Sequence, residues 1–227
     1  MISVWVEKAG SWWFGVAHHG GRLVATASGA NRKAAAGAVR ACLPRGREFQ
    51  MVREGSEYAR SVVRLLARLE AGAEEAPFFE LCPDCVGELL ASVLHAASTI
   101  PRGYVATYGG IAEVAGTEAR VVGRAMSTNP LYPIVPCHRV VGSDLSLVGY
   151  TGSQDPAALR AKLERLRAEA RGFVEEKTIG VGGARIDGPG GGAVARPGGG
   201  LRVYPVERVI AKAAREGLDA GVQLSLW

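Results

Sequence analysis

The sequence predicts an α+β protein: a small α/β N-terminal domain, then a mostly helical C-terminal domain with a winged helix-turn-helix-like motif and a flexible glycine-rich tail. Three observations predict this class. Apolar and polar residues alternate in short bursts over residues 1–30, two short helical patterns adjoin over 111–127, and about half of residues 180–200 are glycine. The expected boundaries are 1–80, 86–175, 180–200 for the linker and 201–227 for the tail.

The N-terminal domain is predicted from a change in the period of its apolar residues. Alternation interrupted by glycine-containing turns indicates strands, whereas Tyr58–Leu69 repeats its apolar residues with helical spacing. Residues 34–41 also favour a helix. No residue pattern typical of catalysis occurs in this part of the chain. The predicted strands are Ile2–Val6, Trp12–Ala17, Leu23–Ala27 and Glu48–Arg53.

The C-terminal domain is predicted to begin after a connector at 72–83. A helical pattern over Val86–Thr99 precedes an extended segment, Tyr104–Gly110, and two short helices joined by Gly116-Thr117-Glu118. That spacing is typical of a helix-turn-helix, and small residues on the second helix would let its backbone approach another surface closely. The predicted helices after residue 110 are 111–115, 119–127, 156–171 with Asp155 as N-cap, and 205–215.

Composition limits the cellular context. The 227 residues carry a formal charge of +5, with 48% hydrophobic and 22% charged residues, as in an ordinary globular protein. No apolar run approaches the ~20 residues that span a bilayer. The first residues lack a basic stretch followed by an apolar one, so we expect a cytoplasmic protein without membrane association. The basic excess permits a polyanionic partner but does not require one.

The four cysteines do not form a secreted disulfide framework. Cys82-Pro83-Asp84-Cys85 is a lone CxxC motif, compatible with half a zinc site, a redox pair or a stabilising disulfide. We favour a structural role. Cys137 differs, because it follows the rigid Pro136 and precedes His138 and Arg139. Neighbouring cationic groups favour the nucleophilic thiolate, so we predict a reactive cysteine; the alternative is a buried structural one.

Three segments of the C-terminal half carry a resemblance to a known family. Residues 100–116 (IPRGYVATYGGIAEVAG), 119–130 (ARVVGRAMSTNP) and 134–152 (IVPCHRVVGSDLSLVGYTG) resemble the catalytic half of the O6-alkylguanine-DNA alkyltransferases. The resemblance implies a methylated-DNA–protein-cysteine methyltransferase that acts once. Such a protein flips an alkylated guanine out of duplex DNA and transfers the alkyl group to its own cysteine, without metal or cofactor.

The resemblance also implies roles for individual residues. Cys137 matches the alkyl acceptor, and His138 matches the histidine that acts on the thiol through a water molecule. Glu169, expected in the same helix as Leu163 and Leu166, matches the carboxylate that orients the histidine. Asn129 matches the asparagine that braces the turn between recognition helix and active site.

The residues that match DNA and base contacts lie on both sides of the cysteine. Arg120 matches the arginine that intercalates in place of the flipped base, and Tyr108 matches the tyrosine that contacts the target phosphate and the guanine edge. Val140 matches the position whose carbonyl binds the exocyclic amine. The pocket loop is matched by Tyr150, Thr151 and Gly152, with the Thr151 N–H bonding the base oxygen. The implied partner is therefore duplex DNA containing O6-alkylguanine, bound by a monomer in the minor groove largely independently of sequence.

The chain departs from the family pattern at several positions. Arg124 stands where a small residue is usual, and we expect it to contact a phosphate. Tyr132 replaces a proline or alanine beside the pocket, and residues 144–149 lack glycines often found there. Both differences bear on which alkyl groups fit. Zinc ligands known in some relatives have no equivalents, so we predict no metal in the catalytic half.

The sequence is also compatible with other functions and with one further partner. A non-catalytic sensor of alkylated DNA is the main alternative, although relatives of that kind replace the cysteine. A helix-turn-helix transcription factor would not explain Pro-Cys-His-Arg, and a cysteine hydrolase would need direct thiol–histidine contact. At the C-terminus, Gln223-Leu224-Ser225-Leu226-Trp227 resembles peptides that bind replication sliding clamps. The alternative there is a packed or disordered end.

Overall fold

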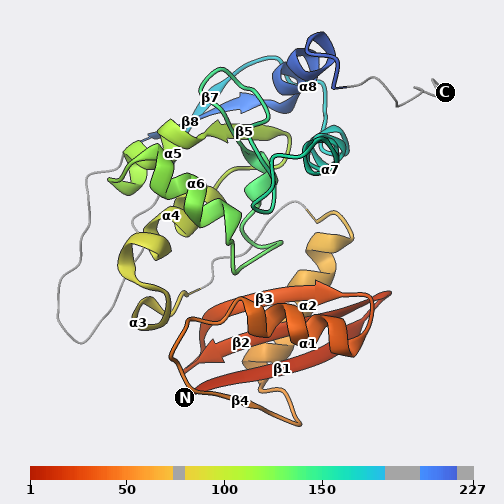
Figure 1. The fold of residues 1–227 in the computed structure, drawn as a ribbon, viewed down its shortest axis with the longest axis vertical. Coiled ribbons are helices and arrows are strands. Elements are labelled where there is room, and N and C mark those ends of the chain that lie inside the picture. The colour runs from red at the N-terminus through yellow and green to blue at the C-terminus, as the bar shows by residue number, and fades with distance from the viewer. Residues whose placement is uncertain (74–79, 182–199, 219–227) are drawn as a thin grey trace.

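The structure is a computed structural model, and it describes residues 1–73, 80–181 and 200–218. Among these residues the chain forms two four-stranded sheets, one in the N-terminal and one in the C-terminal part, each accompanied by helices (Figure 1). The predicted α+β class is confirmed. No helix in the described part of the chain is long and apolar enough to cross a membrane.

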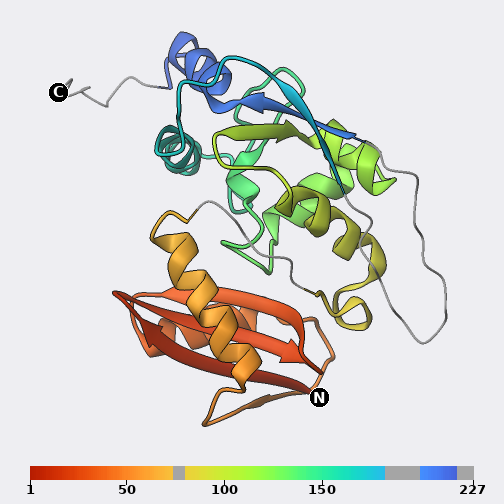
Figure 2. The ribbon, with the colours of Figure 1, turned by 180° about the vertical axis from the view of Figure 1, so that it is seen from behind.

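The N-terminal sheet has the strand order β3-β2-β1-β4, with β1–β2 and β2–β3 antiparallel and β1–β4 parallel. Helix α1 covers one face and α2 the other (Figures 1 and 2). Asn31 and Ser56 cap the two helices by accepting hydrogen bonds from backbone N–H groups. The elements are β1 (Ile2–Ala9), β2 (Trp12–His19), β3 (Arg22–Gly29), α1 (Arg32–Ala41), β4 (Phe49–Met51) and α2 (Glu57–Glu70).

The C-terminal sheet has the order β6-β5-β8-β7. Helices α5 and α6 form the predicted helix-turn-helix, joined at Gly116, which ends α5 in the left-handed conformation at φ +66°. Tyr108 begins α5 and is not extended as predicted, because the Thr107 side chain caps the helix there. The elements are α3 (Pro83–Val86), α4 (Glu88–Ser98), β5 (Tyr104–Thr107), α5 (Tyr108–Ala115), α6 (Ala119–Ser127), η1 (Cys137–Arg139), β6 (Val140–Val141), α7 (Pro156–Arg167), β7 (Lys177–Gly180), β8 (Gly200–Pro205) and α8 (Val206–Arg215).

The segment assigned from sequence to a tail is partly folded. Residues 200–205 form β8, which pairs with β5 and with β7, and α8 follows directly. Leu201 and Val203 alternate with polar residues and are fully buried, so this short strand completes the core. The adjoining glycines conceal that alternation in the sequence. The remainder of the predicted linker, 182–199, and the predicted clamp-binding peptide, 223–227, lie outside the described residues.

The two parts of the chain share one apolar core, which includes Phe14 and Leu66 from the first part and Leu94 and Leu131 from the second. Thr26 of β3 also reaches across, because its N–H donates to the Pro130 carbonyl (2.7 Å) and its hydroxyl donates to the Tyr132 carbonyl (3.0 Å). The N-terminal sheet therefore supports the turn that leads to Cys137. Of the alternatives open for the CxxC motif, the structure has the disulfide, between Cys82 and Cys85.

Candidate active site

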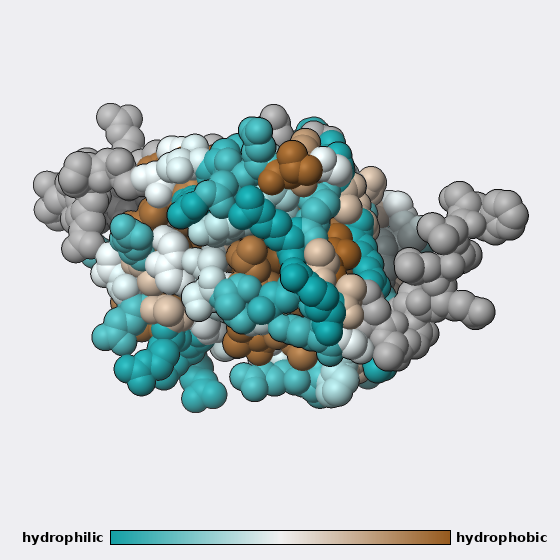
Figure 3. Space-filling view, turned by 90° about the horizontal axis from the view of Figure 1, so that it is seen from above, coloured by the Kyte–Doolittle hydropathy of each residue, from teal (hydrophilic) through white to brown (hydrophobic). Residues whose placement is uncertain are grey.

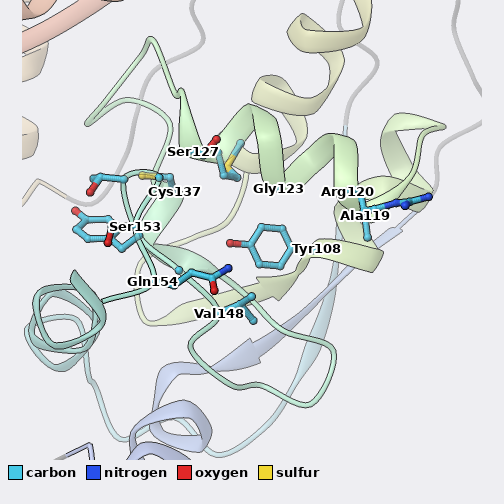
Figure 4. Close-up of a pocket in the computed structure, with 14 residues that line it drawn as sticks. Tyr108, Ala119, Arg120, Gly123, Ser127, Cys137, Val148, Ser153 and Gln154 are labelled. Carbon is cyan, nitrogen blue, oxygen red and sulfur yellow. The ribbon is translucent and has the colours of Figure 1, made fainter. Parts of the chain in front are cut away.

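Cys137 begins a single turn of 3-10 helix, η1, between the rigid Pro136 and strand β6. Its side chain borders a pocket of about 360 Å³ and is only 5% exposed. In Figure 4, Cys137 and Arg120 lie toward opposite ends of the pocket with Tyr108 between them. The lining residues come from α5, α6, η1 and the loop before α7: Tyr108, Ala119, Arg120, Gly123, Met126, Ser127, Cys137, Val148, Gly149, Tyr150, Thr151, Gly152, Ser153 and Gln154.

The thiol of Cys137 is protonated at rest. Burial raises its pKa, and this outweighs the hydrogen bond from Asn129 and the positive charges of Lys162 and Arg165, which act in the opposite direction. Positive charges thus favour the thiolate, as expected from the sequence, but they are those of Lys162 and Arg165 and not of His138 and Arg139, and burial of the sulfur outweighs them in the resting site. A base must remove the proton when the cysteine reacts.

Asn129 holds the turn that carries the cysteine. Its side-chain Nδ2 donates to the Val135 carbonyl at 2.7 Å, and its Oδ1 accepts from the Leu131 N–H at 3.0 Å. These two bonds join the end of α6 to the segment entering η1. Because the donors and acceptors are partly buried, losing the amide would leave unsatisfied polar groups next to Cys137.

His138, Arg139 and Glu169 form a buried polar cluster behind the cysteine. Glu169 Oε1 lies 2.9 Å from His138 Nε2, and both carboxylate oxygens accept from the Arg139 guanidinium at 2.8 Å. Glu169 lies beyond the end of α7 and not inside a helix over 156–171 as predicted, since the helix ends at Arg167. A turn with the Glu169 N–H bonded to the Leu166 carbonyl directs the carboxylate inward.

The charges in this cluster are set by burial and by the pair contacts. Burial lowers the pKa of His138, and the opposing effect of Glu169 does not reverse this, so the imidazole is neutral near pH 7. Burial raises the pKa of Glu169, but hydrogen bonds and charges from His138 and Arg139 outweigh it and lower that pKa to about 2. His138 Nδ1 is buried without a hydrogen-bond partner among the described residues. The cluster thus offers a neutral imidazole with one nitrogen free to accept a proton.

Tyr108 and Arg120 border the pocket from the helix-turn-helix. Burial, and then the adjacent Cys137, raise the pKa of Tyr108, so its phenol remains a hydrogen-bond donor. Arg120 is the second residue of α6, and 93% of its side chain is exposed. Its Nη2 lies 3.6 Å from Glu118 Oε2. Arg124 is exposed one turn further along α6 but does not line the pocket. Arg120 and Arg124 can therefore both reach a partner outside the protein.

The loop over Tyr150, Thr151 and Gly152 lines the pocket beside Cys137. A pair of backbone hydrogen bonds between Tyr150 and Ser153 closes it, and Thr151 and Gly152 take positive φ values of 48° and 80°. Glycine adopts this conformation readily, whereas threonine does so rarely. The loop is thus a tight turn whose residues form part of the pocket wall.

Lys162 is a site residue that the sequence analysis missed. It is fully buried, and its ammonium group donates to the Val140 carbonyl at 2.5 Å and the Gly149 carbonyl at 2.8 Å. Burial lowers its pKa to about 8, although nearby Cys137 acts in the opposite direction. Val140 itself is buried and does not line the pocket. The helical spacing of Leu159, Leu163 and Leu166 places Lys162 on the inner face of α7, and this signal could have identified it.

The fold and site together define a DNA-binding type of domain in which a buried cysteine borders a pocket and the next residue is a neutral histidine bonded to a carboxylate. The family model for the DNA-binding domain of 6-O-methylguanine DNA methyltransferase matches residues 88–171. A methylated-DNA–protein-cysteine methyltransferase of Methanosarcina acetivorans is 38% identical over 113 residues, covering 49% of this chain and 72% of that protein. The chain therefore belongs to the methylated-DNA–protein-cysteine methyltransferase family.

Two further comparisons cover different shares of the chain. A relative of the same name from Pyrobaculum aerophilum is 66% identical over 53 residues, but these make up only 23% of this chain and 36% of that protein. The crystal structure of an O6-methylguanine-DNA methyltransferase from Pyrococcus kodakaraensis matches with a TM-score of 0.50 and 28% identity, covering 75% of this chain and all of that one. The similarity to the solved structure thus extends beyond the matched family domain.

Proposed function

We propose that this protein repairs DNA by direct reversal, transferring one alkyl group from O6 of guanine in duplex DNA to Sγ of Cys137. The observation that carries the proposal is the arrangement at Cys137: a buried thiol borders a pocket lined by the helix-turn-helix, and the next residue along the chain is a neutral histidine held by a carboxylate. Family membership supports the same chemistry. Because the thioether formed is stable, each chain acts once.

The chemical step requires a proton acceptor and a proton donor but no cofactor. A sulfur lone pair attacks the alkyl carbon, an S–C bond forms, and the C–O6 bond breaks with its electron pair left on O6. The thiol proton passes to His138 Nδ1, through water as the family resemblance implies, while Nε2 donates to Glu169. Hydrogen bonds from Tyr108 and the Thr151 N–H stabilise the guanine anion during departure. The anion then takes up a proton from water, and the imidazolium returns the thiol proton to water, so that neutral guanine and a neutral histidine result.

The base has to leave the duplex before Cys137 can reach its edge. Unstacking costs a few kcal/mol and is repaid by contacts in the pocket, whose volume of about 360 Å³ lies within the range of small-molecule sites. Arg120 is well placed to fill the gap in the stack, because its side chain is 93% exposed at the start of α6. Arg124, one turn along, is suited to a phosphate contact. Minor-groove binding through phosphates would be salt-sensitive and largely independent of sequence.

A non-catalytic sensor of alkylated DNA is the alternative. It would use the same helix-turn-helix and pocket, but it would have no use for a nucleophile with an aligned base. Cys137, His138 and Glu169 are all buried, and His138 lies within hydrogen-bond distance of Glu169. We therefore favour transfer over sensing.

The proposal is tested by the stoichiometry of repair. Excess duplex containing O6-methylguanine is incubated with the protein, and restored guanine is counted against protein. A plateau at one guanine per chain supports single-turnover transfer. Cys42 is the other free cysteine, so Cys42→Ser is the matched control and should repair normally, whereas Cys137→Ser should not. Tight binding of the damaged duplex without any repair would favour the sensor.

A further inference from the structure

The 142–149 loop connects β6 with the pocket residues and has an internal hydrogen-bond pattern of its own. The Gly142 N–H donates to the Ser146 carbonyl at 2.9 Å, and the Leu145 N–H donates to the Gly142 carbonyl at 3.0 Å. Asp144 Oδ1 accepts from both the N–H and the hydroxyl of Ser146. Leu145 has φ +65°, a conformation that a leucine rarely adopts. Contacts from outside the loop must favour this conformation.

Those contacts come from α8. Leu145 and Leu147 pack in an apolar cluster with Val206, Val209 and Ala213 on the inner face of the helix. On its outer side, Lys212 Nζ lies 3.0 Å from Asp144 Oδ2. Viewed from above in Figure 3, the face of the molecule over this region is mostly hydrophilic with small enclosed apolar areas. The loop is thus fixed by one buried and one partly exposed contact.

Helix α8 is itself held in place relative to the active site. Strand β8, which leads into it, pairs with β5, and β5 in turn pairs with β6 directly after η1. The Val206 N–H donates to the Gly103 carbonyl at 3.0 Å. Glu207 Oε1 accepts from three successive N–H groups at residues 171–173, so it ties α8 to the segment after α7. Because α8 is fixed in this way, its contacts can hold the 142–149 loop in a defined position.

The loop ends in the pocket wall. Lys162 holds its far end through the Gly149 carbonyl at 2.8 Å, and the Val148 side chain between the two anchors lines the pocket. Val148 also lies close to the backbone at Gly142, where an added Cβ would be 2.9 Å from its Cγ2. In the view of Figure 4, Val148 lies toward Tyr108 and away from Cys137. Its position therefore affects the bound base more than the reacting sulfur.

We propose that β8–α8, which follows the residues that match the family model, is a positioning element for base binding: Lys212 and the apolar face of α8 hold the 142–149 loop and thereby set Val148 in the pocket wall. The expected effect on base binding rests on the proposed alkyl transfer, whereas the contact between α8 and the 142–149 loop does not. Lys212 is a positioning residue, since it touches Asp144 and not the substrate.

The first test measures hydrogen exchange of the free protein. In Lys212→Met, amides of residues 142–149 should exchange about threefold faster, as loss of a partly exposed ion pair allows, and Lys212→Arg should restore protection. Arg215→Met is the matched control, because Arg215 lies on the same helix and, among the residues that the structure describes, its hydrogen bond stays within that helix, to the Ala211 carbonyl. Unchanged exchange in Lys212→Met would overturn the proposal.

The second test separates base binding from chemistry. With O6-methylguanine duplex in excess, Lys212→Met should raise the half-saturating DNA concentration about threefold and leave the limiting transfer rate unchanged. Leu145→Ala should raise the half-saturating DNA concentration further. A fall in the limiting rate alone would overturn the inference, because it would place the effect on the sulfur. Absence of transfer by the unaltered protein would instead refute the proposed function, and the exchange experiment would still decide the loop contact.

Discussion

The Glu169 carboxylate binds two neighbouring side chains, His138 and Arg139. Replacing Glu169 with glutamine therefore perturbs the buried cluster with little change in side-chain size. Both Arg139 contacts, at 2.8 Å, need acceptors, and a glutamine side chain offers only one oxygen. One guanidinium N–H then faces an amide N–H₂ inside the protein. Arg139 keeps its bond to the Ile100 carbonyl but loses its counter-charge.

The magnitude follows from the pKa of Glu169, which lies at about 2 compared with an ordinary value of 4.5. Each pKa unit corresponds to about 1.4 kcal/mol, so ionised Glu169 contributes about 3 kcal/mol to the free energy of unfolding at neutral pH. Breaking a buried ion pair from one side typically costs about 3–5 kcal/mol, which agrees. For a chain of this size, Glu169→Gln should lower the melting temperature by about 6–12 °C.

The pH dependence provides the sharper assay. Because the pKa of Glu169 is lower in the folded than in the unfolded chain, its contribution is complete above about pH 4.5 and is lost as the pH falls from there toward 2. Urea unfolding of both proteins at pH 7 and at steps down to pH 3 should therefore show a stability difference that is largest at pH 7 and shrinks below pH 4.5.

Glu175→Gln is the matched control, because Glu175 is exposed and only six residues away in sequence. It should change stability by less than about 0.5 kcal/mol at any pH in the series. A Glu169→Gln difference below about 1 kcal/mol, or one that stays constant between pH 7 and pH 3, would refute the reasoning. The carboxylate would then be no better placed in the folded chain than in the unfolded one.

Three further predictions concern the site. Asn129→Ala should lower the free energy of unfolding by about 2–3 kcal/mol in denaturant titrations, because partly buried backbone groups lose partners, and should slow transfer to Cys137. Lys162→Met should slow transfer to Cys137 at least tenfold in single-turnover assays. Its melting temperature should differ from that of the unaltered protein by less than about 5 °C, because removing a buried charge offsets the loss of two hydrogen bonds. Arg120→Ala should leave stability within about 0.5 kcal/mol but weaken transfer from duplex DNA and not from free O6-benzylguanine, because its side chain is 93% exposed. Equal losses on both substrates would contradict a role for Arg120 in base flipping.

Much of the fold follows from local patterns. Alternation over residues 1–30 locates the first three strands, and helix α6 has the predicted bounds, Ala119–Ser127, because its apolar residues keep helical spacing. Strand β8 was not predicted. It has only a few residues, begins in a glycine-rich stretch and is stabilised by β5, nearly a hundred residues away in the chain.

The site shows the same division between local and long-range information. Cys137, His138 and Asn129 lie within one stretch of sequence, so their proximity could be predicted. The protonation state of Cys137 could not, because it depends on how completely the fold buries the sulfur. Lys162 was missed for a related reason: a lysine in a helix is usually solvated, and only the packing of α7 against the pocket loop shows otherwise.

The central claim is that Cys137 accepts an alkyl group, and intact mass spectrometry tests it most directly. After incubation with duplex DNA containing one O6-methylguanine, the chain should gain the mass of one methyl group in place of a proton. The gain should map to the peptide containing Cys137, should not exceed one per chain, and should be absent in Cys137→Ser. An unchanged mass after full binding of the duplex, or a methyl group located on Cys42, would contradict the account.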